Sequence, residues 1–131
     1  MEQVKQVRVV VKEPNKQAEE RLIDNTLRGY QKAVDGWIES VCLPQHEDNI
    51  DIVMNDEGKL LNMETNVYVD EYKDFFVGTL VAVGVNKNDL TWRSLTDEEI
   101  KCAIKWFDEH DIRNYYKKVD NGNTIYQKSI I

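Results

Sequence analysis

An almost wholly apolar run of eight residues constrains the fold of this chain more than any other feature. The run, Gly-Thr-Leu-Val-Ala-Val-Gly-Val, extends from Gly78 to Val85. A short apolar run bounded by turn-forming residues predicts a central β-strand that is buried on both faces. Gly84 inside the run predicts a bulge or a close approach of another part of the backbone. The chain must therefore supply further strands beside this segment and helices packed on the sheet.

The clearest helix signal follows this strand. The sequence Thr-Asp-Glu-Glu at 96–99 has the pattern of a capping box, in which the Thr96 hydroxyl and the Glu99 carboxylate each bind a backbone amide of the other residue. Beyond it, apolar side chains recur at the spacing of one helix face. They are Ile100, Ala103, Ile104 and Phe107. We therefore expect a helix from Asp97 to about Glu109.

A second helix is predicted near Thr26 to Asp35. Thr26 is a favourable N-cap residue, and Gly36 is well placed to end the helix. Leu27, Tyr30 and Val34 lie between them at spacings of three and seven residues, which places them on one face.

Further strands are predicted by short β-branched or alternating segments. They are Val7–Lys12, Glu19–Asp24, Trp37–Leu43 and Ile50–Met54. Glu64–Phe75 has mixed signals and reads as irregular, and Asn86–Arg93 reads as a loop. Asn-Gly at 121–122, between the β-prone runs Tyr115–Val119 and Thr124–Lys128, predicts a C-terminal β-hairpin.

These elements predict an α+β fold: a mostly antiparallel sheet with two helices packed on it, plus a C-terminal β-hairpin. A chain of 131 residues has the size of a single domain, and no linker or repeat divides it. We therefore expect one domain over 1–131, with the hairpin extension at 112–131.

The charge balance excludes some classes of partner. Acidic residues outnumber basic ones by 24 to 17, which gives a formal net charge of −7. This disfavours direct nucleic-acid binding and binding to anionic membranes. It suits a partner with a basic face, although a solvated acidic surface with no partner explains it as well.

The sequence also predicts a cytoplasmic location. It contains no apolar run of about 18 residues, and charges interrupt the apolar residues of Met1–Lys12, which is unlike a signal peptide. Cys42 and Cys102 are accordingly expected to be buried free thiols rather than a disulfide.

The order of these signals resembles the DUF3846 family, a small domain of unknown function found in phages and mobile elements. The resemblance covers about residues 7–108, outside the terminal hairpin. The segments that carry it are Lys12-Glu13-Pro14, Arg21–Leu27, Val34–Glu39, Val41–Pro44, Asn55–Leu60, Gly78–Val81 and Ser94–Ile100. It implies a phage or plasmid accessory protein and no catalytic residues. The segment Asn66–Phe75 is longer than the family pattern leads us to expect.

The sequence shows no motif for catalysis, a metal or a cofactor. His46-Glu47-Asp48 with Asp51 lacks the ligand spacing of a zinc site and reads as an acidic surface loop. His110 reads as a helix C-terminal residue that complements the helix dipole. Cys42 has no neighbouring base in the sequence and reads as a thiol of the core. We therefore expect a protein that is not an enzyme.

Two binding hypotheses remain open. In the first, the protein counters host defence by sequestering a small nucleotide signalling molecule. Trp92 would stack on the base and Arg93 would bind phosphate, with Arg21, Arg28 and Tyr30 as further contacts. A homo-oligomer is compatible with this role, since a cleft between subunits encloses a ligand better than a small monomer does.

In the second hypothesis, the protein inhibits or regulates a host protein, such as a nucleic-acid-binding host protein, by binding it through the acidic surface. Five tyrosines outside the clearest core elements suit an interface, although half-buried sheet residues would look the same. They are Tyr68, Tyr72, Tyr115, Tyr116 and Tyr126.

Overall fold

The computed structural model describes residues 5–119 and contains two packed β-sheets and three helical segments. The strands are β1 (Gln6–Lys12), β2 (Glu19–Asp24), β3 (Ile38–Cys42), β4 (Ile50–Asn55), β5 (Thr65–Val69), β6 (Asp74–Val77), β7 (Leu80–Val85) and β8 (Trp92–Arg93). The helices are α1 (Leu27–Val34) and α2 (Asp97–His110), followed by an α-helix at 112–119, so the described residues contain one helix more than the two predicted.

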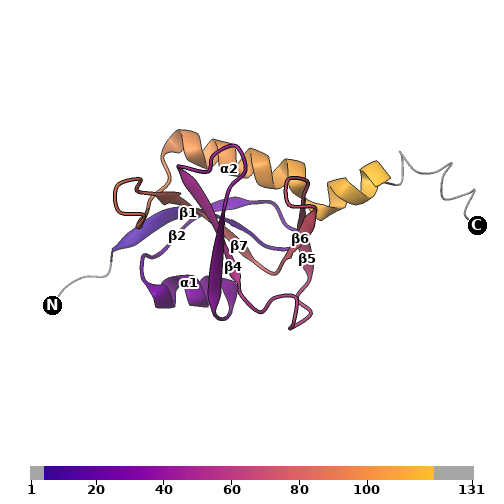
Figure 1. Cartoon of the computed structure of the whole chain (residues 1–131), viewed down its shortest axis with the longest axis horizontal. Coiled ribbons are helices and arrows are strands. Elements are labelled where there is room, and N and C mark those ends of the chain that lie inside the picture. The colour runs from indigo at the N-terminus through magenta and orange to yellow at the C-terminus, as the bar shows by residue number, and fades with distance from the viewer. Residues whose placement is uncertain (1–4, 120–131) are drawn as a thin grey trace, which may run out of the picture.

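The main sheet has the strand order β2-β1-β7-β4-β3, and β8 pairs with the end of β7 (Figure 1). Every pairing in it is antiparallel. β7 lies between β1 and β4, and all six of its residues are buried. The predicted α+β class and the predicted central strand are therefore confirmed.

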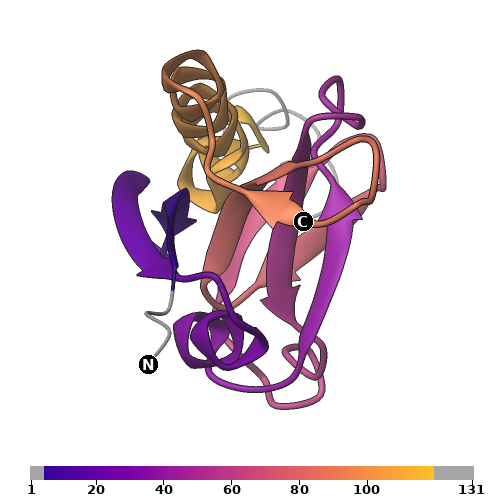
Figure 2. The same cartoon turned by 90° about the vertical axis from the view of Figure 1, so that its left-hand side faces the viewer.

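The two helices cover opposite faces of this sheet, as Figures 1 and 2 show. Because side chains alternate along a strand, β7 sends Val81 and Val83 to the α1 face, and Leu80 and Ala82 to the α2 face. On the α1 face these valines form one apolar cluster with Tyr30 and Val34 of α1. The α2 face is covered by α2 and by the β5–β6 hairpin, which form the larger apolar cluster.

Both predicted helix starts are confirmed. The Thr96 hydroxyl accepts a hydrogen bond from the Glu99 amide at 3.2 Å, and the Glu99 carboxylate accepts from the Thr96 amide at 2.9 Å. The Thr26 hydroxyl accepts from the Gly29 amide at 3.0 Å. Within the described residues, no helix is long and apolar enough to cross a bilayer.

A buried polar network joins three elements on the α2 face. The Lys12 ammonium is 1% exposed and lies 2.9 Å from Asp111 Oδ2. It also donates to Asn66 Oδ1 and to the backbone oxygen of Glu13, each at 2.9 Å. Asn66 in turn donates from Nδ2 to the backbone oxygens of Lys12 and Gly78. Every buried side-chain polar atom in the described part of the chain has a partner.

Three predictions about local structure are wrong. Residues 115–119 are helical rather than the first strand of a hairpin; the rest of that hairpin, 120–131, lies outside the described residues. The segment Glu64–Phe75 is not irregular, because it contains β5 and the start of β6. The part of the loop Asn86–Arg93 that contains Trp92 and Arg93 forms β8.

The network around Lys12 leads to a prediction about stability. Replacing Asp111 by Asn keeps its shape and its ability to cap the following helix, but leaves the buried Lys12 ammonium without a counter-charge. We expect Asp111→Asn to lower the free energy of unfolding by about 3–5 kcal/mol at pH 7. Chemical denaturation measures this loss, and Asp70→Asn in an exposed turn serves as the matched control with no change expected.

The same substitution has a predictable pH dependence. Burial alone would raise the pKa of the Asp111 carboxyl, but hydrogen bonds from Arg113 and Lys12 outweigh it and hold that pKa far below its ordinary value. A depressed folded-state pKa stabilises the protein above the unfolded value of about 3.9, and this contribution is lost as the pH falls below it. The difference between wild type and Asp111→Asn should therefore shrink below about pH 4. A difference that stays constant down to acid unfolding would contradict the assignment.

The close approach predicted at Gly84 is confirmed and can be tested. A Cβ atom at this position would clash with Arg93 Nη1 and would lie 2.9 Å from the backbone oxygen of Ser94. We expect Gly84→Ala to cost about 1–3 kcal/mol of stability, because the overpacked site must displace Arg93. The cost should be smaller in an Arg93→Ala background, as a double-mutant cycle would show.

Candidate functional site

The structure brings two of the five predicted binding residues together. The rings of Tyr30 and Trp92 meet edge to face, with centroids 4.6 Å apart. Tyr30 donates its hydroxyl to Asn25 Oδ1 at 2.6 Å, and Trp92 donates its indole N–H to Asp51 Oδ2 at 2.9 Å. Both rings line an open hollow beside the start of α1, and both also pack against the apolar cluster of the α1 face.

The three predicted arginines lie elsewhere. Arg93 points to the opposite face from its neighbour Trp92, where it holds both oxygens of Glu99 at 2.7 and 3.0 Å. Arg21, on β2, is paired with Glu13 and Glu19. Arg28 is exposed on α1 and forms no ion pair with the described residues. The predicted contacts therefore do not converge on one pocket.

The cysteines and histidines do not form a reactive centre in the described part of the chain. No group of three His, Cys, Asp or Glu side chains there could hold a metal ion. The Nδ1 atom of His110 lies 2.7 Å from the backbone oxygen of Trp106. Both thiols are free as predicted, but the prediction that they are buried is wrong: Cys42 is exposed and Cys102 is half-buried. Partial desolvation and the nearby Asp51 raise the pKa of the Cys42 thiol, which disfavours the reactive thiolate.

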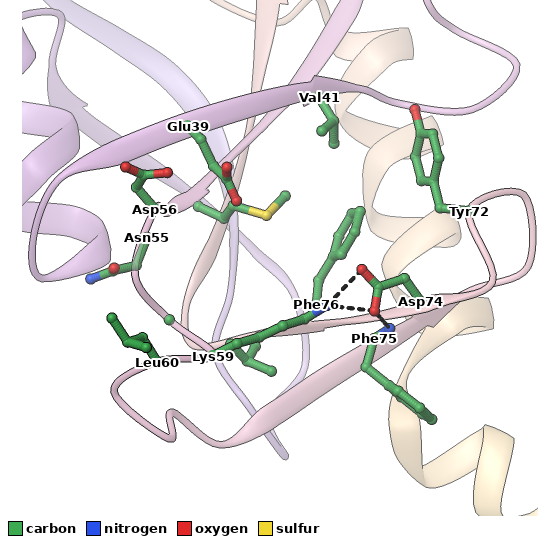
Figure 3. A pocket seen from close by; sticks show the side chains of 13 residues that line it. Glu39, Val41, Asn55, Asp56, Lys59, Leu60, Tyr72, Asp74, Phe75 and Phe76 are labelled. Atoms are coloured by element: carbon green, nitrogen blue, oxygen red, sulfur yellow. Dashed lines mark hydrogen bonds and ion pairs between the residues drawn. The ribbon is translucent and has the colours of Figure 1, made fainter.

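A groove with a mixed polar and apolar lining lies on the α2 face, between β3 and the β5–β6 hairpin (Figure 3). Its volume is about 550 Å³. Val41, Met54 and Phe76 supply apolar side chains that continue the core cluster. Tyr72 forms one wall, and its ring stacks on Phe76 with a centroid distance of 6.0 Å. The groove therefore offers apolar surface that the described residues leave accessible.

Charged side chains line the opening of this groove, and most of them are acidic. The carboxylates belong to Glu39, Asp56 and Asp74, and the single ammonium belongs to Lys59 (Figure 3). Lys59 donates to both oxygens of Asp74, at 2.5 and 2.6 Å. This bond lowers the pKa of Asp74 and occupies the ammonium. Glu39 and Asp56 are left without a basic partner inside the groove.

Glu39 and Asp56 lie close enough to influence each other. Partial desolvation and the neighbouring Asp56 carboxylate raise the pKa of Glu39. Two carboxylates in this situation create a local negative potential, which a cationic group from a partner would relieve. The groove consequently combines an apolar floor with an acidic rim.

Sequence reasoning missed this groove because it missed one of its walls. The β5–β6 hairpin lies in the segment that gave mixed signals, where a β-bulge between Thr65 and Val67 breaks the alternation of side chains. The hairpin could have been predicted from two apolar pairs on either side of the turn at 70–73. These pairs are Val67–Tyr68 and Phe75–Phe76.

Comparisons with known proteins give one match. No curated protein and no solved structure matches the chain. A family model described as a domain of unknown function, DUF3846, matches residues 7–109. The matched region contains every strand from β2 to β8, helix α1, all but the last residue of α2, and the whole groove beside β3. Because the match spans far more than half of the 131 residues, the chain belongs to the DUF3846 family.

Proposed function

We propose that this protein works by binding another protein, and that the groove beside β3 receives a segment of the partner that carries basic and apolar side chains. The observation that carries the proposal is the composition of the groove, in which three carboxylates and one lysine surround an apolar floor. Lys59 is already neutralised by Asp74, so the groove attracts cations and repels anions. In a phage or mobile element, such a protein would inhibit or regulate a basic host protein in the cytoplasm.

Electrostatic complementarity gives this kind of interface its specificity and its fast association. The net charge of −7 adds a long-range attraction toward any basic partner. The accessible apolar lining, which includes Val41 and Leu60, would supply the part of the affinity that does not depend on salt. A partner that offers both kinds of side chain would therefore be preferred over a purely cationic one.

Sequestration of a small nucleotide is the second candidate. The hollow beside the start of α1 supports it, because the half-buried Trp92 ring lines this hollow and an aromatic ring can stack on a base. The pairing of Arg93 with Glu99 and of Arg21 with Glu13 leaves less cationic charge for a phosphate. Calorimetric titration with cyclic and ADP-ribose-derived nucleotides tests this candidate, and the absence of heat with folded protein would count against it.

The first candidate is tested by selecting peptides from a displayed random library on the purified protein. We expect the selected peptides to contain Lys or Arg together with apolar residues. The double variant Glu39→Gln/Asp56→Asn should weaken binding of the best peptide about tenfold, since two rim charges are removed. Raising the salt concentration from about 0.05 M to about 0.5 M should weaken wild-type binding in the same direction.

The matched control for this experiment is Glu98→Gln/Glu109→Gln. It changes the net charge by the same amount at two exposed positions of α2, away from the groove. If both double variants reduce binding equally, the effect belongs to the overall charge and the groove is not the site. If selection enriches no peptide on the folded protein, the proposed function is wrong.

A further inference from the structure

The edge strand beside the groove presents an unpaired backbone. β3 is the last strand of the main sheet, so only β4 pairs with it among the described residues. The Leu43 amide donates to the Ile50 oxygen at 2.9 Å, and the Asp56 amide donates to the Trp37 oxygen at 2.8 Å. In an antiparallel pair, hydrogen-bonded residues alternate with residues whose backbone groups point away. The N–H and C=O groups of Ile38, Ser40 and Cys42 therefore point out of the sheet.

One contact supports this orientation directly. The Tyr72 hydroxyl reaches across the groove and donates to the backbone oxygen of Cys42 at 3.2 Å. That oxygen must consequently lie on the outer side of β3, as the alternation requires. The outward groups of Ile38 and Ser40 have no hydrogen-bond partner among the described residues.

The opposite edge of the sheet differs in its side chains. Four of the six residues of β2 are charged, and two of them, Glu20 and Arg21, take part in ion pairs with neighbouring segments. Charged side chains on an edge strand are a common protection against pairing with another chain. β3 carries only one charge in five residues, Glu39, and that side chain belongs to the groove rim. The sheet thus protects one edge and leaves the other available.

We propose that the partner segment adds to β3 as an extra strand and places every second side chain over the groove. This inference rests on the proposed function, since it specifies how the basic segment is held. A strand beside β3 would have neighbours Glu39 and Val41 on the groove face, two residues apart. The segment that fits therefore has a basic residue and an apolar residue at positions i and i+2, in an extended conformation.

The charge of the groove selects such a partner over a second copy of this chain. Antiparallel pairing of two β3 strands would bring two acidic rims together, each with Glu39 and Asp56. Like charges on neighbouring strands destabilise a pairing. A basic segment of another protein relieves the same charges.

The experiment uses the best peptide from the random library selected on the wild-type protein. Two copies of this peptide are N-methylated at alternate residues, one at the odd and one at the even positions, and only one of them loses the N–H groups that an added strand would donate to β3. We expect that copy to bind tenfold or more weakly than the unmodified peptide, and the other copy to bind about as well as it. Hydrogen exchange of the Ser40 amide should also slow when the unmodified peptide is bound.

A variant of the protein gives the complementary test. Ser40→Pro removes an N–H that points away from β4, so it costs no hydrogen bond within the sheet. It should weaken peptide binding tenfold or more, whereas Ser40→Ala, which keeps the backbone donor, should not. Circular dichroism checks that the proline variant folds, and the methylated peptides keep the test independent of that variant.

The outcomes separate this inference from the proposed function. One outcome is that binding depends on Glu39 and Asp56 but is unaffected by either set of N-methyl groups and by Ser40→Pro. This outcome would overturn strand addition and leave groove binding intact. If the wild-type protein forms dimers in solution and Ser40→Pro dissociates them, strand addition by a partner is also overturned. In that case a second copy of the chain covers the edge of β3. Failure to enrich any peptide would overturn the proposed function and this inference together.

Discussion

The position of the buried Lys12 ammonium governs how the second sheet meets the first. A buried ammonium is tolerated only where a counter-charge and hydrogen-bond acceptors surround it, and Asp111, Asn66 and the Glu13 carbonyl supply them. Asn66 belongs to β5, and its side chain also binds the backbone at Gly78, just before β7. The network therefore fixes the β5–β6 hairpin against the main sheet. Since β6 forms one wall of the groove, the same buried charge pair determines the shape of the candidate site.

Much of the fold could be predicted from local sequence because its signals are local. The capping box at Thr96, the N-cap at Thr26 and the apolar run ending at Val85 each act within a few residues, and the structure contains the elements that they predict. β5 could not be predicted in this way, because its bulge and its buried Asn66 depend on contacts with β1 and β7. The helical conformation of residues 115–119 also depends on a contact that is distant in sequence, so local sequence wrongly predicts a strand there. Asp111 is held by Lys12 and caps a further helix through the Arg113 amide.

The candidate site, too, could not be predicted from local sequence alone. Trp92 and Arg93 are adjacent in sequence, but β8 is a strand, so their side chains point to opposite faces of the sheet. Their separation follows from strand geometry once β8 is recognised. The groove beside β3 is built from three segments that are distant in sequence, around Glu39, Asp56 and Asp74. Each of them alone reads as an ordinary surface acid, and only the tertiary fold places them around an apolar floor.

The acidic groove and the open edge of β3 have a common structural origin. The β5–β6 hairpin packs on the α2 face but does not extend the main sheet, so it walls the groove, and no strand within residues 5–119 pairs with the outer side of β3. Tyr72, in the turn of that hairpin, donates a hydrogen bond to the outer backbone oxygen of Cys42 at the end of β3. Had the hairpin paired with β3, the sheet would be longer and both the groove and the edge would be lost. An edge strand with unpaired backbone groups is a template on which another chain can pair, and the carboxylates beside it favour a chain that carries positive charge. A basic segment would therefore pair with the backbone and neutralise the charges in a single binding event.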